Sequence, residues 1–164
     1  MDYRGAVVFG VGMDRMFKRY GIENREGCEL ARIALRSHKT PVTKIVSECL
    51  RLLRGRYPDL RLVISYADPD QEHVGVIYQA GNWVYTGMST AAGEYWIPGE
   101  GRVHGRTLIH RHGTKVNHSH CKVMGSSKHR YLMPLDKKMR REVERLRVPY
   151  PKKGLVNEDD THGT

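Results

Sequence analysis

The middle of the chain predicts an α/β fold (α+β), a mixed central sheet flanked by helices, from three segments. Residues 60–66 contain a short apolar run rich in β-branched side chains at 62–64, and residues 30–35 alternate between two sets of side chains, both of which are typical of strands. Residues 44–54 instead place apolar side chains three and four positions apart, as on one face of a helix. Two strands joined by one helix form a right-handed parallel crossover. We therefore expect a parallel strand pair covered by this helix.

The connecting helix has sequence signals at both of its ends. Thr40 is typical of an N-cap and Pro41 of a first helical position. Gly55 and Pro58 indicate where the helix ends before the next strand.

Weaker patterns predict further elements on both sides of this unit. A second segment of helical spacing covers residues 73–85. Asp136 is typical of the N-cap of a basic C-terminal helix, whose apolar face carries Met139, Val143 and Leu146. Additional strands are expected at residues 6–11, 94–97, 107–110 and 128–132, with a turn at residues 99–101.

The length of 164 residues suits one compact domain. We expect that domain over residues 1–153 and disorder over residues 154–164, a short acidic stretch. The three cysteines are widely spaced, which argues against a disulfide scaffold and favours a reducing cytoplasm. No apolar run has the length that a membrane-spanning helix needs.

The net charge of +10 is concentrated in one part of the chain. Residues 1–100 hold 13 Lys and Arg against 12 acidic residues, whereas residues 101–153 hold 15 against three. Such an asymmetry favours a polyanionic partner, most simply nucleic acid, over a solvated basic surface without a partner.

Polar and aromatic side chains gather where the strand at residues 60–66 ends. Ser65, Tyr66 and Asp68 come at its carboxyl end, and Tyr78 and Asn82 follow on the next segment. Open α/β sheets build their sites at such strand ends. The pattern predicts a substrate site here.

Four stretches of the chain form a recognisable set. They are Cys-Glu-Leu-Ala-Arg-Ile at residues 28–33, Ser-Tyr-Ala-Asp-Pro through Tyr-Thr-Gly at 65–87, His-Gly-Arg at 104–106, and Lys-His-Arg-Tyr-Leu through Pro-Tyr-Pro-Lys at 128–152. The chain thereby resembles the Mom family of phage DNA-modification proteins, whose folds are like those of the GNAT acetyltransferases. The resemblance implies a GNAT-like catalytic domain over residues 1–153 and double-stranded DNA as the partner. It also implies a transferase in the cytoplasm of the infected bacterium that converts the exocyclic amine of DNA adenine to a carbamoylmethyl form, which protects phage DNA from host restriction.

One departure from the acetyltransferase pattern concerns the cofactor. The glycine-rich pyrophosphate loop of those enzymes is replaced by residues 37–43, which contain no glycine. Close approach of a backbone to a pyrophosphate needs glycine, although a helix start with Lys39, Thr40 and Thr43 still suits an anion. The sequence therefore leaves the cofactor open between acetyl-coenzyme A, which this departure disfavours, and iron.

The implied reaction sets requirements on the site. The target adenine must leave the duplex and enter a pocket between flat side chains, for which Tyr66, Tyr78, Trp83 and Tyr85 are the candidates. Asn82 suits the adenine edge, or else a turn. The exocyclic amine needs a base, and Asp68 is our candidate, its alternative being a turn former before a proline.

Several other residues receive roles, each beside a simpler alternative. Arg32 lies within an apolar strand, so we expect a partner for its charge, either a carboxylate or a bound anion. Thr43 contacts substrate or caps its helix, and His73 shares the proton transfer or lies on the surface. His104 and Arg106, two apart on an expected strand, face the same side and contact phosphate or cofactor, or are simply exposed.

A last group is assigned to DNA and, more weakly, to metal. The expected phosphate contacts are Lys128, Arg130, Tyr131, Lys137, Lys138, Arg140 and Arg141. His118, His120 and Cys121 match no strong zinc spacing and are only weak ligand candidates.

Two other functions remain open from the residues alone. One is an acetyl-coenzyme A-dependent N-acetyltransferase of a small amine or protein, which measured coenzyme A binding would identify. The other is a phage protein that binds DNA without catalysis, which would leave nucleoside composition unchanged.

Overall fold

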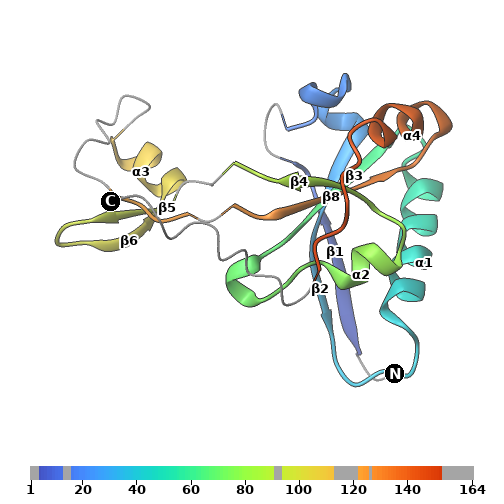
Figure 1. Cartoon of the computed structure of the whole chain (residues 1–164), viewed down its shortest axis with the longest axis horizontal. Coiled ribbons are helices and arrows are strands. Elements are labelled where there is room, and N and C mark those ends of the chain that lie inside the picture. The colour runs from blue at the N-terminus through green and yellow to red at the C-terminus, as the bar shows by residue number, and fades with distance from the viewer. Residues whose placement is uncertain (1–3, 13–15, 91–93, 113–121, 126, 153–164) are drawn as a thin grey trace.

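The computed structural model describes residues 4–12, 16–90, 94–112, 122–125 and 127–152, which form a body and a projecting arm (Figure 1). The body contains a five-stranded sheet with the order β1-β2-β3-β8-β4. Its strands are β1 (Gly5–Gly10), β2 (Gly27–Leu35), β3 (Leu62–Ala67), β8 (His129–Pro134) and β4 (Val84–Met88). Three short 3₁₀ turns lie at Lys18–Tyr20, Asn24–Glu26 and Pro69–Gln71. The prediction of a mixed α+β fold is confirmed.

The predicted crossover forms the centre of the body. Strands β2 and β3 are parallel and are joined by helix α1 (Val42–Arg56). The helix begins one residue later than expected, because Pro41 has an extended backbone (φ −54°, ψ 138°) and itself precedes the first turn. Thr40 is therefore not the N-cap, and no side chain caps this helix.

The segment after β3 is helical over a shorter range than its spacing predicts. Helix α2 covers only Val76–Ala80, between Gly75 (φ 73°) and a turn in which Asn82 has φ 57°. A Cβ at Gly75 would lie 2.4 Å from the Tyr131 ring, so this position requires glycine for its backbone angle and for the close approach. The chain then re-enters the sheet as β4, because Trp83 and Val84 are buried there.

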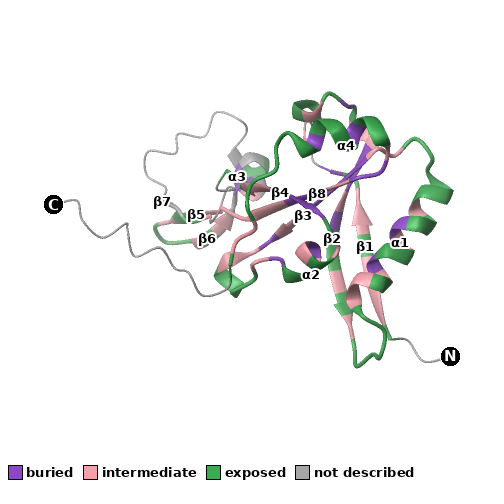
Figure 2. Cartoon of the chain, turned by 45° about the vertical axis from the view of Figure 1, so that its right-hand side comes forward, coloured by how far each residue is buried: buried purple, intermediate pink, exposed green. Residues whose placement is uncertain are grey.

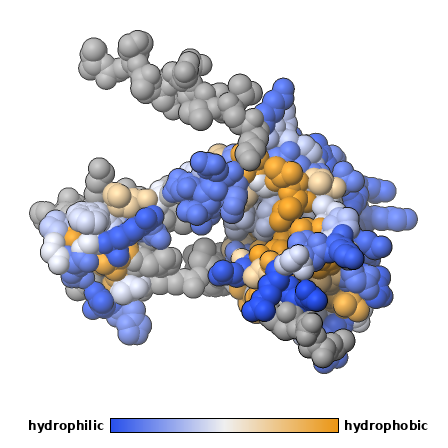
Figure 3. Space-filling model, turned by 90° about the horizontal axis from the view of Figure 1, so that it is seen from below, coloured by the Kyte–Doolittle hydropathy of each residue, from blue (hydrophilic) through white to orange (hydrophobic). Residues whose placement is uncertain are grey.

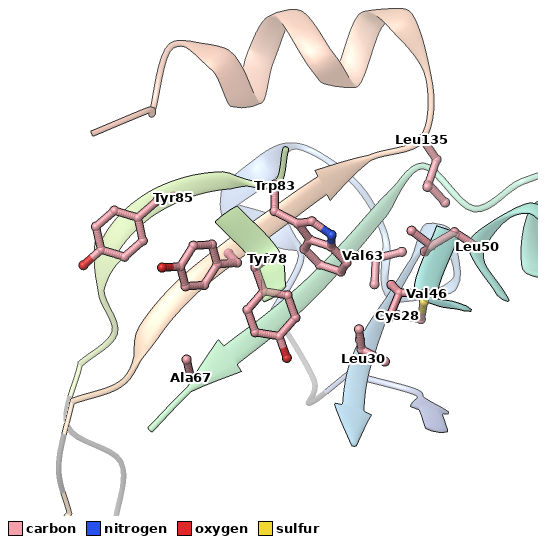
Figure 4. Close-up of a cluster of buried hydrophobic side chains, with 11 residues drawn as sticks. Cys28, Leu30, Val46, Leu50, Val63, Ala67, Tyr78, Trp83, Tyr85 and Leu135 are labelled. Carbon is pink, nitrogen blue, oxygen red and sulfur yellow. The ribbon is translucent and has the colours of Figure 1, made fainter. Parts of the chain in front are cut away.

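The two faces of the sheet carry separate cores. Val63 points to the face covered by α1 and α2 (Figure 4), and Tyr131 belongs to the same buried cluster. Ile64 and Leu132 point to the opposite face, beneath Phe17 and helix α4 (Lys137–Glu144). Figure 2 shows that buried residues concentrate in the central strands and on the inward sides of the helices.

The arm is a second, three-stranded sheet inserted between β4 and β8. The sheet is formed by β5 (Glu94–Ile97), β6 (Gly101–His104) and β7 (Lys122–Val123), in the order β6-β5-β7. Helix α3 (Gly105–His112) follows β6 and completes the arm. The predicted strand at residues 107–110 is wrong: this segment lies in α3, where Leu108 is 1% exposed, so packing overrides local strand preference. The arm stands apart from the body (Figures 1 and 3).

The C-terminal helix confirms its predicted start but not its predicted length. The Met139 amide donates to the Asp136 carboxylate at 2.7 Å, as expected for an N-cap. Helix α4 ends at Glu144, so Leu146 lies beyond it and is 46% exposed, whereas Met139 and Val143 are buried. The predicted acidic tail, residues 154–164, lies outside the described residues. Within the described part of the chain, no helix is long and apolar enough to cross a membrane.

Asp136→Ala should lower stability by about 1 kcal/mol, a typical loss for an N-cap. Asp136 also accepts from Arg61 Nε at 2.8 Å, so the change removes two interactions of a partly exposed carboxylate. Thermal unfolding should show a melting temperature lower by about 2–4 °C, the shift expected for a domain of this size. Asp59→Ala, on an exposed turn, serves as the control and should leave the melting temperature unchanged.

The same interaction predicts a pH dependence. Burial alone would raise the pKa of Asp136, but hydrogen bonds from Met139 and Arg61 outweigh it and hold the pKa below its usual value. The stabilisation is therefore present above the unfolded-state pKa of about 3.9 and is lost as the pH falls through the folded-state pKa. An equal effect of Asp136→Ala at low and neutral pH would contradict this assignment.

Candidate active site

The first feature of the site is a partial separation of two central strands. Strands β2 and β3 pair only at Gly27–Leu62, Cys28–Val63 and Glu29–Ile64, although β2 continues to Leu35. Beyond these pairs, the Leu30 carbonyl oxygen lies 2.8 Å from the Ser65 hydroxyl, which replaces a strand partner. Ser65 Oγ also lies 2.7 Å from Tyr78 Oη, and both side chains are buried. Ser65 and Tyr78, both chosen from the sequence, thus meet at this divergence.

A cavity of about 860 Å³ lies beside Tyr78, between α1 and α2. Thr43 from the first turn of α1 and Asn82 from the turn after α2 both line it, together with Trp83. Its lining also includes the cationic residues Lys44, Arg51, Arg54 and Arg140. Glu48 is the acidic residue of the lining and is bound to Arg51, with 2.9 Å between Glu48 Oε2 and Arg51 Nε. The cavity therefore suits a ligand with negative charge.

An array of aromatic rings runs along the same face of the sheet. Successive centroids are 5.1 Å apart from Trp83 to Tyr78, from Tyr78 to Tyr131 and from Tyr131 to Tyr85, and His129 follows at 5.6 Å. Figure 4 shows Trp83, Tyr78 and Tyr85 within one buried cluster. These rings contact one another as ordinary core residues do.

The assignment of Tyr131 to DNA is wrong. Tyr131 is completely buried, and its hydroxyl donates to the Val74 carbonyl oxygen at 2.6 Å. Burial raises the pKa of Tyr131 to about 12. Its role is to join β8 to the segment before α2.

Tyr66 does not share the face on which Tyr78 lies. Successive strand residues point to opposite faces, so Tyr66 packs beneath α4 near Tyr20, whereas Ser65 points toward Tyr78. Burial, followed by the neighbouring Tyr20, raises the pKa of Tyr66. The buried Tyr20 hydroxyl has no hydrogen-bond partner among the described residues. The predicted single cluster of tyrosines is therefore divided between two faces.

Asp68 has the turn-forming contact that was its alternative role. Its carboxylate accepts from the Asp70 amide at 3.1 Å and lies 2.9 Å from Lys128 Nζ. The bond from Lys128 is the main cause that holds the pKa of Asp68 below its usual value. Asp68 is thus ionised but a weak base, and Lys128 is bound to a carboxylate of the protein itself.

Three other expectations require correction. Arg32 is exposed, because the outer half of β2 pairs with β1 alone and leaves this position uncovered, so no buried charge needs a partner. His104 ends β6 whereas Arg106 lies in α3, so the two do not share a strand. Arg130 is partly buried, and its guanidinium donates to Thr86 Oγ1 at 2.8 Å.

The remaining assigned residues lie on the surface. His73 is exposed after the turn that follows Asp68, and Asn82 is exposed at the mouth of the cavity. Lys137, Lys138, Arg140 and Arg141 are all exposed on α4. His118, His120 and Cys121 lie outside the described residues, and the described ones include no cluster of three metal-ligating side chains.

Two residues of the site were missed by sequence reasoning. Glu29 is the last residue of β2 that pairs with β3, and its carboxylate contributes to raising the pKa of both Tyr66 and Tyr78. The signal was present: Glu29 is the acidic residue of an otherwise largely apolar strand. The second residue, His129, is partly buried, with Nδ1 2.8 Å from Tyr85 Oη.

Together, fold and site define an α+β protein with an open cavity lined by cations and with a cationic outer helix. The chain belongs to the Mom protein family, whose family model matches residues 1–152. Membership makes it a phage DNA-modification protein, which acts on DNA. A comparison with curated proteins found no match.

His129 should titrate below the usual range for histidine. Burial lowers the pKa of His129, so its imidazole is neutral at pH 7. Since the folded-state pKa lies below the unfolded value of about 6.5, protonation should destabilise the fold as the pH falls through that value. An NMR titration, with His129→Asn to assign the signal, should place its midpoint below that of the urea-unfolded chain; an equal or higher midpoint would contradict the burial argument.

Proposed function

We propose that this protein converts the exocyclic amine of DNA adenine to a carbamoylmethyl-substituted amine and thereby protects phage DNA from host restriction. The proposal rests on membership in the Mom family and on one observation. That observation is the strand divergence at Ser65 and Tyr78, which opens beside a cavity lined by cations. This arrangement supports a reaction between a donor in the cavity and an acceptor that reaches the divergence.

The acceptor amine determines what the protein must supply. Its lone pair is delocalised into the adenine ring. When the nitrogen bonds to the carbamoylmethyl carbon, the bond from that carbon to the donor's leaving group breaks with its electron pair, and the nitrogen must lose a proton to a base. Glu29 supports this role better than Asp68, because it is the last paired residue of β2 and, by strand alternation, shares the face of Tyr66, whose pKa its charge helps to raise. Asp68 is bound to Lys128 and its pKa is lowered, which weakens it as a base. We therefore assign proton removal to Glu29 and turn formation to Asp68.

The donor side of the proposal rests on the cavity. Thr43 lies at the start of α1, and Lys44, Arg51 and Arg54 follow on the same helix, so an anionic portion of a donor would find positive charge along its length. The strand order β1-β2-β3-β8-β4, with one crossover helix and a divergent central pair, supports a GNAT-like core. The absence of glycine from residues 37–43 separates this cavity from the usual pyrophosphate loop.

Expression of the chain in a bacterium tests the reaction. Mass spectrometry of nucleosides from the host DNA should show deoxyadenosine heavier by one carbamoylmethyl group. Glu29→Gln should reduce that product at least 100-fold, the lower range for loss of a general base. Asp68→Asn is the matched control and should retain most of the activity.

The comparison of these two variants identifies the base. Loss of product with Asp68→Asn but not with Glu29→Gln would return the role to Asp68. Absence of modified deoxyadenosine from cells that contain folded native protein would remove the proposed function itself. Circular dichroism of each variant establishes that it is folded.

The same proposal assigns duplex binding to the exposed cations of α4. Removal of one phosphate-binding cation should reduce the slope of log affinity against log salt by about 0.9. Lys137→Ala and Arg141→Ala should each lower this slope in a fluorescence-anisotropy titration. Arg25→Ala is the control, because Arg25 is exposed but its charge is already paired with Glu23. Equal slopes for all four proteins would show that α4 does not contact phosphate.

A further inference from the structure

The arm carries a tryptophan that is half exposed. Trp96 on β5 is 49% exposed, whereas Trp83, the second tryptophan of the chain, is 1% exposed in the body. Alternation along β5 places Trp96 on the face opposite Tyr95 and Ile97. A half-exposed aromatic ring on a projecting element is accessible to a partner, and its charged neighbours indicate which kind of partner it suits.

Both strand partners of Trp96 in the arm sheet are basic residues. In the strand register, Trp96 lies between Arg102 of β6 and Lys122 of β7. The acidic residues Glu94 and Glu100 of the described arm are bound to arginines, Glu94 to Arg102 and Glu100 to Arg111. Arg106 and Lys122 then leave the arm with excess positive charge. This charge is complementary to a polyanion and unsuited to a basic partner such as a second copy of the chain.

The position of the arm relates it to α4. Strand β8 leads directly from the base of the arm to the residue that caps α4, and its six residues span about 20 Å. Figure 1 shows the arm and α4 toward opposite ends of the long axis, with the strands of the body between them.

We propose that the arm is a second DNA-contacting element, in which Trp96 packs against nucleobases of the duplex that α4 holds by its phosphates. An aromatic ring is neutral, so it does not attract phosphate. It stacks favourably on the face of a base, and extrusion of one nucleotide exposes the faces of the bases next to it. The proposal rests on the proposed function, because base extrusion is what exposes those faces.

Intrinsic fluorescence tests the contact directly. Because the chain contains two tryptophans, the difference between the native protein and Trp96→Phe isolates the signal of Trp96. Acrylamide should quench Trp96 in the free protein, and a short DNA duplex should shield it, while Trp83 stays inaccessible in both states. Equal quenching of Trp96 with and without saturating duplex would overturn the proposal.

Affinity gives an independent measurement. Trp96→Ala should weaken duplex binding about tenfold, as expected when one aromatic ring is removed from a base face, and should leave the salt slope unchanged because no charge is removed. Trp96→Phe should restore most of the affinity. Tyr57→Ala is the matched control, since Tyr57 is 55% exposed at the end of α1, and should bind like the native protein. Native affinity for Trp96→Ala, or an equal loss for Tyr57→Ala, would overturn the proposal.

The failures of the two proposals can be told apart. If the native protein modifies adenine while Trp96→Ala binds duplex normally, the arm assignment is wrong and the proposed function stands. If duplex shields Trp96 but no modified deoxyadenosine forms, the arm assignment stands and the reaction is wrong. If Trp96→Ala instead changes the oligomeric state without DNA, the surface is a protein interface and the arm assignment is wrong.

Discussion

The body depends on the unequal pairing of strand β3. On one side β3 pairs with β8 along its whole length, from Leu62–Pro134 to Ala67–His129, and on the other it pairs with β2 at only three positions. Leu62, Val63 and Ile64 are completely buried, so the strand is held firmly where both neighbours are present. Where β2 departs, backbone groups need other partners, and Ser65 supplies one of them. The functional site is thus a consequence of an incomplete ladder within a rigid sheet.

Charge pairing explains why the basic third of the chain is not uniform. Lys128 is bound to Asp68, and Arg130 is bound to Thr86, so the residues at the start of β8 join neighbouring segments to one another. The cations of α4 are exposed, because Met139 and Val143 alone turn toward the core. The basic residues of this third of the chain therefore have two roles: some bind other segments of the protein, and others face solvent. Burial distinguishes the two groups.

Local patterns predicted the elements whose residues bury one clear face. The crossover from β2 through α1 to β3, strand β8 and the Asp136 cap were all predictable, because strand runs, helical periodicity and capping residues are local signals. Helix α2 is shorter than predicted because Gly75 is fixed by its contact with Tyr131. The segment of α3 was predicted as a strand, because the burial of Leu108 depends on tertiary contacts. The arm as a separate sheet was not visible in the sequence at all.

The site was predictable in composition more than in arrangement. Ser65, Tyr78, Thr43 and Asn82 do gather at one place, as strand-end reasoning indicates. Tyr66 and Arg32 do not, because strand parity and the divergence of β2 from β3 decide which face a side chain occupies and whether it is covered. Glu29 became a candidate only once the pairing of its strand was known.

The hydrogen bonds at the base of the arm have one further consequence. The Ser89 amide donates to the Lys128 carbonyl oxygen at 2.7 Å, and the Lys128 amide donates to Ser89 Oγ at 2.9 Å, so the two connections lie against each other. The arm is in effect an enlarged hairpin loop whose two ends already meet. Its length and content are free to diverge between relatives without altering the strand register that the rest of the protein requires, which makes it a natural module for adapting one scaffold to different targets.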